Sequence, residues 1–186
     1  MITLLIQEIL DSAGHTLKDL DAVAISQGPG SYTGLRVGAS CAKGLCYGSQ
    51  LKLLAIPTLS IIAQAQQNKG FQRIVPMIDA RRMEVYYNVY DDDLQAQQET
   101  DNLILDASAF QFFNDKTVVF CGDGAFKMKD LGLSEGWQVV EEGALAEHMA
   151  PLAEARYKAQ NFEDVAYYVP FYLKPPNITK STKSLF

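Results

Sequence analysis

The sequence predicts an α/β protein with two lobes, and three observations lead to this prediction. Segments with the pattern of buried strands alternate with amphipathic helices along the 186 residues. The hydrophobic fraction of 48% and the charged fraction of 20% are typical of a globular protein with a buried core. A break at Asn68-Lys69-Gly70 separates a first lobe, 1–69, from a second lobe, 70–173, which a flexible basic tail follows at 174–186.

The first lobe is predicted to begin directly with a helix. Ile2, Leu5 and Ile9 recur at helical spacing without a capping residue before them, and Gly14 can end the helix in a left-handed conformation. Four further elements are expected in this lobe: a buried strand over 21–26, a helix over 33–47, a strand over 52–56 and a helix that starts at Pro57-Thr58.

The second lobe is predicted to open with a β-hairpin. Two β-rich runs, 73–80 and 83–91, flank a tight turn at Arg81-Arg82. The remaining predicted elements are a helix over 107–113, a buried strand over 117–121 and a helix over about 147–159.

Charge and composition exclude some classes of protein. A net charge of -6 argues against a protein that binds nucleic acid alone through a broad basic surface. The most apolar run, 51–65, contains Lys52 and Pro57 and is too short to cross a membrane. The three cysteines have no paired spacing, so we expect reduced, buried thiols in a cytoplasmic protein.

A glycine-rich turn between the first predicted strand and the helix after it is the sharpest local motif. A turn of this kind can bind phosphate through its backbone N–H groups. Neither standard phosphate pattern fits, however: no GxxxxGK[ST] is present, and Thr33 stands where a dinucleotide fingerprint requires glycine. The pattern therefore favours a tight packing turn, made of Gly28, Pro29, Gly30, Ser31, Tyr32 and Thr33.

The helix after this turn has one face with almost no side chains. Gly34, Gly38 and Ala42 follow one another at intervals of four residues. Glycine inside a helix costs about 0.5–1 kcal/mol relative to alanine, so a close approach by another helix is expected there. That helix belongs either to this chain, as its own first helix, or to a second subunit.

Residues suited to catalysis or metal binding are few. His15 and His148 lie far apart in no ligand spacing, and Ser31 is not in a GxSxG pattern. The acidic run 91–93 lacks the spacing of a calcium loop. We therefore predict no catalytic residue, no metal site, no cofactor and no enzymatic activity of the chain alone.

Four segments together resemble the TsaB family. They are GPGSYTGLR at 28–36, IDARR with EVY at 78–86, GDG at 122–124 and PFYLK at 170–174. The resemblance implies an actin-like, duplicated ribonuclease-H-like fold. It also implies strands upstream of the first helix, so the first lobe is expected to be incomplete, with an exposed apolar helix stripe.

The resemblance also implies a function and partners. TsaB is the inactive paralogue that activates TsaD, which forms threonylcarbamoyladenosine beside the tRNA anticodon. A TsaE-like ATPase would then join through that complex, tRNA would be contacted only indirectly, and the isolated chain would form a homodimer. The residues expected to face TsaD are Leu5, Ile9, Gly34, Arg36, Gly38 and Ala42.

Two further segments correspond to the nucleotide loops of actin-like ATPases. The hairpin tip with Asp79 and Arg81 lacks the glycines that wrap phosphates, so an anion contact or an ion pair with Glu84 is expected instead. Gly122 and Gly124 form a degenerate adenosine loop that also fits a plain strand-to-helix turn. The alternative functions are an ATP-binding carbamoyltransferase-like enzyme, a metallopeptidase of the same superfamily, or an interaction protein outside tRNA biology.

Overall fold

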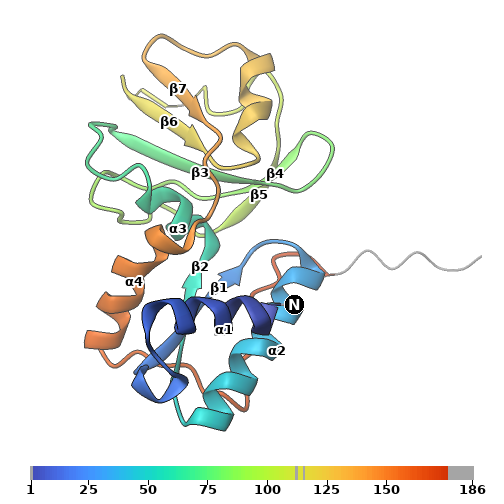
Figure 1. The fold of residues 1–186 in the computed structure, drawn as a ribbon. Helices are drawn as coiled ribbons and strands as arrows, with labels where there is room; N and C mark the ends of the chain where they lie inside the picture. The colour runs from blue at the N-terminus through green and yellow to red at the C-terminus, as the bar shows by residue number, and fades with distance from the viewer. Residues whose placement is uncertain (1, 112, 115, 176–186) are drawn as a thin grey trace, which may run out of the picture.

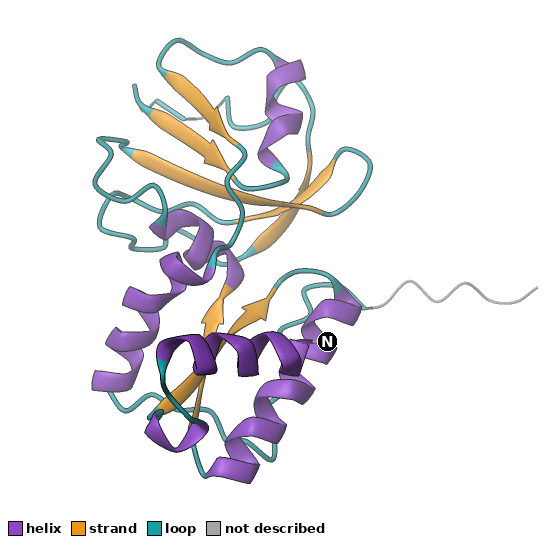
Figure 2. Cartoon of the chain, viewed as in Figure 1, coloured by secondary structure: helices purple, strands orange, loops and turns teal. Residues whose placement is uncertain are grey.

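The computed structural model describes residues 2–111, 113–114 and 116–175. The strands form two separate sheets, one in each half of the molecule, and α3 lies where the halves meet (Figure 2). The described strands thus belong to a two-stranded sheet and a five-stranded sheet that share no strand.

The first lobe contains two parallel strands, β1 and β2, whose register runs from Ala22 opposite Lys52 to Ser26 opposite Ile56. Ala39 and Cys46 of the long helix pack against Leu53 of β2 in a shared core. The elements of this lobe are α1 (Ile2–Ala13), η1 (Leu17–Asp19), β1 (Ala22–Gly28), α2 (Tyr32–Ser49), β2 (Lys52–Pro57) and α3 (Thr58–Gln64).

Helix α1 buries little of its apolar surface. Leu10 is its one buried residue among those described, whereas Leu4, Leu5 and Ile9 are 63%, 55% and 65% exposed. The expected exposed stripe is therefore present, beside a first sheet of two described strands.

The second lobe is built on a five-stranded sheet in the order β5-β4-β3-β6-β7 (Figure 1). Antiparallel pairing joins β3 to β4 and β4 to β5, whereas β6 and β7 run parallel to β3. The strands are β3 (Arg73–Asp79), β4 (Glu84–Tyr87), β5 (Asp101–Ile104), β6 (Val118–Cys121) and β7 (Trp137–Val140), with η2 (Ala125–Leu131) between the last two.

The chain returns to the first lobe after β7. Helix α4 (Ala146–Lys158) packs against β1, β2 and α3. The Glu163 N–H then donates to Leu53 O, and Tyr168 joins the core of the first lobe. Residues 146–171 therefore pack against the first lobe, although the sequence assigned them to the second.

The predicted helix over 107–113 is wrong in the described residues. Residues 107–111 form turns, and Phe110 has a φ of 63°, which a right-handed helix does not allow. Its ring is buried among Tyr87, Phe113 and Phe120, so long-range aromatic packing outweighs the local helical pattern. The predicted tail lies outside the described residues from position 176 onward.

Candidate functional site

The glycine-rich turn is held by a threonine from the start of α3. Thr58 Oγ1 lies 2.6 Å from Ser26 Oγ and accepts a hydrogen bond of 3.1 Å from the Gly28 N–H. At the other end of the turn, Ser31 caps α2 by accepting from the Gly34 N–H at 3.3 Å. Two N–H groups near the turn are thus already bound within the chain.

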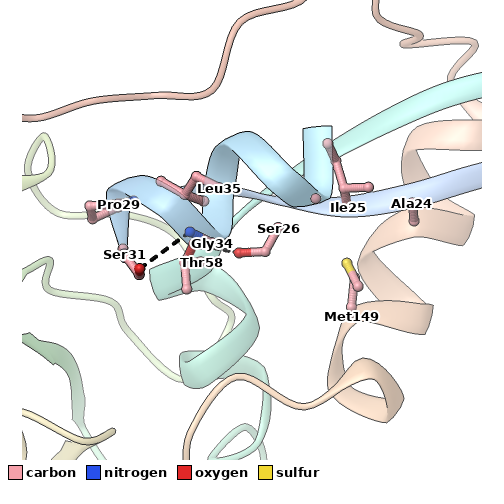
Figure 3. Close-up of a pocket in the computed structure, with 11 residues that line it drawn as sticks. Ala24, Ile25, Ser26, Pro29, Ser31, Gly34, Leu35, Thr58 and Met149 are labelled. Atoms are coloured by element: carbon pink, nitrogen blue, oxygen red, sulfur yellow. Dashed lines mark hydrogen bonds between the residues drawn. The ribbon is translucent and has the colours of Figure 1, made fainter. Parts of the chain in front are cut away.

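Beside this turn lies a hollow of about 420 Å³ (Figure 3). Its lining comes from the edge of β1, the turn, the first half of α2, Thr58 and Met149 of α4. Figure 3 shows the Met149 side chain opposite the turn, across this space from Thr58. The hollow is mostly apolar, with hydroxyl groups from Ser26, Ser31 and Thr58 on one side.

The bare face of α2 divides between this hollow and the core. Gly34 and Gly38 line the hollow, and a Cβ atom added at Gly38 would meet no other atom within 4 Å. The first helix of this chain therefore does not pack against Gly38. Ala42 is 3% exposed and belongs to the core of the first lobe, so its prediction as an interface residue is wrong in this structure. Arg36 is exposed, and its guanidinium lies 5.5 Å from the centre of the Tyr32 ring.

The C-terminal segment lies directly on the turn. The Phe171 N–H donates to Gln27 O at 2.9 Å, and the Tyr172 ring lies 5.0 Å from the Tyr32 ring. Both segments are visible as motifs in the sequence. Nothing in the sequence indicates that they are in contact, because about 140 residues separate them.

In the second lobe, Asp79 is bound by a buried lysine. Lys127 Nζ lies 2.6 Å from Asp79 Oδ1 and donates to Glu84 O at 2.8 Å. Burial opposes ionisation of Asp79, but Lys127 and the Arg81 N–H outweigh it and hold the pKa of that carboxyl below its ordinary value. Lys127 was missed by the sequence analysis because a lysine in a short helix looks like any surface residue.

Gly122 and Gly124 are explained by close packing on β3. A Cβ atom on Gly122 would lie 2.3 Å from Met77 O, and one on Gly124 would lie 2.8 Å from the Ile78 carbonyl carbon. The loop between them adds a hydrogen bond of 3.0 Å from the Asp79 N–H to Asp123 Oδ1. Close packing against β3 therefore explains why glycine is needed at these two positions, without any ligand.

The hairpin tip departs from the expected ion pair. Glu84 is bound by Lys174 Nζ and by Asn102 Nδ2, rather than by the arginines of the tip. Arg81 and Arg82 both have positive φ values, 73° and 53°.

Among the described residues, no three His, Cys, Asp or Glu side chains are grouped as metal ligands. No helix of the described chain is long and apolar enough to cross a membrane.

These contacts bring the four sequence motifs into two adjoining clusters. The turn at 28–36 meets the segment 170–174, which reaches Glu84, while the loop 122–124 packs behind Asp79. Fold and site define a two-lobed α/β protein whose second lobe has a ribonuclease-H-like sheet and whose glycine motifs serve backbone packing.

Comparison with known proteins identifies the family. The family "TsaD: tRNA N6-adenosine threonylcarbamoyltransferase" matches residues 1–179. The "tRNA threonylcarbamoyladenosine biosynthesis protein TsaB" of Escherichia coli K12 is 32% identical over 180 residues, which cover 91% of this chain and 78% of that protein. The TsaB of Bacillus subtilis 168 is 27% identical over 184 residues, covering 91% of this chain and 76% of that protein. The chain belongs to the TsaB proteins of this family.

A solved structure agrees with this assignment. YeaZ from Pseudomonas aeruginosa superposes with a TM-score of 0.79 at 26% identity, covering 90% of this chain and 81% of that chain. The predicted fold class, an actin-like, duplicated ribonuclease-H-like α/β fold, is confirmed by this match and by the family.

Proposed function

We propose that this chain is a non-catalytic subunit of the machinery that forms threonylcarbamoyladenosine in tRNA, and that it activates a TsaD-type transferase. The observation that carries the proposal is the similarity to proteins named for threonylcarbamoyladenosine biosynthesis, which extends over 91% of the chain. The match to the TsaD family and the pathway named for the TsaB relatives support a TsaD-type protein as the partner.

The exposed apolar side chains of α1 support a contact with that partner. Leu5 and Ile9 lie four residues apart on the helix and are 55% and 65% exposed. Apolar side chains gathered on one exposed face mark interaction surfaces. On α2, the exposed Arg36 and the open position at Gly38 complete the proposed contact.

Substitutions on α1 and α2 test the proposal. We expect Ile9→Glu and Gly38→Trp to abolish capture of the TsaD-type protein of the same organism, because one adds a charge and the other adds bulk to the contact. Both variants should remain folded, since Ile9 is exposed and Gly38 has open space.

The matched control is Ile104→Glu, which changes an equally exposed apolar residue of the second lobe. Ile104→Glu should leave capture unchanged. Full capture by both Ile9→Glu and Gly38→Trp would overturn the proposed contact surface, and failure of the native chain to bind any TsaD-type protein would overturn the proposed function.

The remaining partner assignments belong to the same proposal. A TsaE-like ATPase would join through the complex, tRNA would be contacted indirectly, the isolated chain would form a homodimer, and the complex would work in the cytoplasm. Calorimetric titration of the chain with Mg-ATP tests the alternative of an ATP-binding enzyme: saturable heat at one site per chain would favour it.

A further inference from the structure

The segment Phe171–Lys174 is here called the strap. It contacts both lobes on the side opposite to the two places where the chain passes from one lobe to the other. Figure 1 shows α3 and the start of α4 together on one side of the molecule, whereas the last described residues, 171–175 (red), lie beside the N-terminal end of α2 on the other side. Each crossing of the chain between the lobes, after α3 and before α4, is therefore on the first of these sides.

At its first-lobe end the strap is built into the glycine-rich turn. The Phe171 N–H donates to Gln27 O, and the strap backbone at Phe171 lies so near Gly28 that a side chain there would collide with it. Tyr172 adds a tilted ring contact with Tyr32, at 5.0 Å between ring centres. Upstream of the strap, Lys43 Nζ donates to Ala166 O at 2.9 Å and to Tyr168 O at 3.2 Å, which fixes the approaching chain to α2.

At its second-lobe end the strap is held by an ion pair. Lys174 Nζ binds Glu84 Oε1 at the start of β4. Glu84 is itself positioned, because Asn102 Nδ2 of β5 donates to its carboxylate at 2.7 Å and Lys127 Nζ donates to its carbonyl oxygen at 2.8 Å. The lysine side chain is 40% exposed and the glutamate side chain 20% exposed, so solvent and salt reach the pair.

Two lobes that are connected along one side can rotate about that side, and a second connection on the far side prevents this rotation. We propose that the strap locks the two lobes into a single relative orientation and that the Lys174–Glu84 pair is its releasable end. The first-lobe end has several backbone and ring contacts, whereas the second-lobe end depends on a screened charge pair. Loss of that pair lets the first lobe pivot about α3, whose Leu59, Ile62 and Ala63 stay packed in the core of the second lobe.

The lock operates within a single chain and requires no partner. The path of contacts nevertheless begins at Arg36 and Tyr32 on α2 and ends at Glu84 in the second lobe. Any ligand that binds differently to the locked and released forms would shift the balance between them.

Distance measurements between spin labels on the full chain test the proposal. One label is placed at Ser40→Cys on α2 and one at Asp130→Cys on η2, both at exposed positions, in a Cys41→Ser background in which Cys46 and Cys121 remain buried. With the native strap sequence, we expect a single narrow distribution of distances between the two labels. In Lys174→Ala, and in 1 M salt, the distribution should be broader and its mean distance longer. Tyr172→Ala, which weakens the first-lobe end, should also broaden it.

The matched control is Lys158→Ala, which removes an exposed lysine–glutamate pair within α4 that joins no two lobes. Circular dichroism confirms that each variant is folded. Broadening in Lys174→Ala or Tyr172→Ala, without broadening in Lys158→Ala, supports the lock. Unchanged distributions in both strap variants, or an equal broadening in Lys158→Ala, would overturn it.

Discussion

A Cβ atom built on Gly28 would lie 2.4 Å from the carbonyl oxygen of Phe171. Gly28 also has a φ of 116°, a conformation that side chains with a Cβ rarely adopt. The first glycine of the motif is therefore required both by its own backbone and by the C-terminal segment that packs on it. This relationship links two sequence motifs that are far apart in the chain.

The two glycines of this region should respond to alanine in opposite ways. We expect Gly28→Ala to lower the free energy of unfolding by about 2–3 kcal/mol, because strained backbone and a collision with Phe171 O add together. Gly38→Ala should instead raise it by about 0.5–1 kcal/mol, because the position is helical and its added Cβ meets no atom within 4 Å. Urea unfolding followed by circular dichroism measures both, and equal effects of the two substitutions would contradict this account.

The ion pair between Asp79 and Lys127 is asymmetric in exposure, and this predicts asymmetric mutational costs. The lysine side chain is 5% exposed and the aspartate side chain 39% exposed. Asp79→Ala leaves a buried ammonium without its carboxylate and should cost about 3 kcal/mol. Lys127→Met leaves a carboxylate that water reaches and that still accepts from the Arg81 N–H, and it should cost about 1 kcal/mol. A larger cost for Lys127→Met, in the same unfolding assay, is the result that would be incompatible with this geometry.

Asp79 should also contribute to acid stability with a defined sign. Its pKa in the folded state is lowered, so its contribution is fully present above the unfolded value of about 3.9 and is lost as the pH falls through the folded pKa. The free energy of unfolding should therefore fall more steeply below about pH 4 in the native chain than in Asp79→Asn. Other carboxyls with lowered pKa, such as Asp106 and Glu154, are common to both proteins and cancel in the difference. Parallel curves from pH 5 to pH 2 would show that Asp79 does not titrate differently on folding.

Local patterns predicted most of the fold. The period of apolar residues placed α1 and α2, and the hairpin of β3 and β4 followed from β-rich runs around a tight turn. Strands β5 and β7 were not predicted, because neither contains a buried residue that would give it the apolar pattern of β6, and their place is set by pairing with β4 and β6.

The candidate site was predictable in its parts but not in its connections. The motifs at Gly28 and Gly122 were visible as glycines, whereas the atoms that require glycine, Phe171 O and Met77 O, come from distant segments. The burial of Lys127 and the pairing of Lys174 with Glu84 depend in the same way on tertiary contacts, which no local spacing records.

Two buried tyrosines of similar exposure should differ in how much their hydroxyl groups contribute to the free energy of unfolding. Tyr168 is 8% exposed, and its hydroxyl has no hydrogen-bond partner among the described protein groups; burial raises its pKa to about 12, with Glu163 adding to the effect. Tyr90 is 5% exposed, and its hydroxyl lies 3.0 Å from Ser60 Oγ.

A buried hydroxyl without a partner destabilises the folded state by about 1–3 kcal/mol, so Tyr168→Phe should leave stability unchanged or raise it by about 1 kcal/mol. Tyr90→Phe removes a hydrogen bond and strands the Ser60 hydroxyl, so it should lower stability by about 1 kcal/mol. Urea unfolding of the two variants beside the native chain measures this difference. A loss of stability in Tyr168→Phe as large as that in Tyr90→Phe would show that the Tyr168 hydroxyl is hydrogen-bonded in solution.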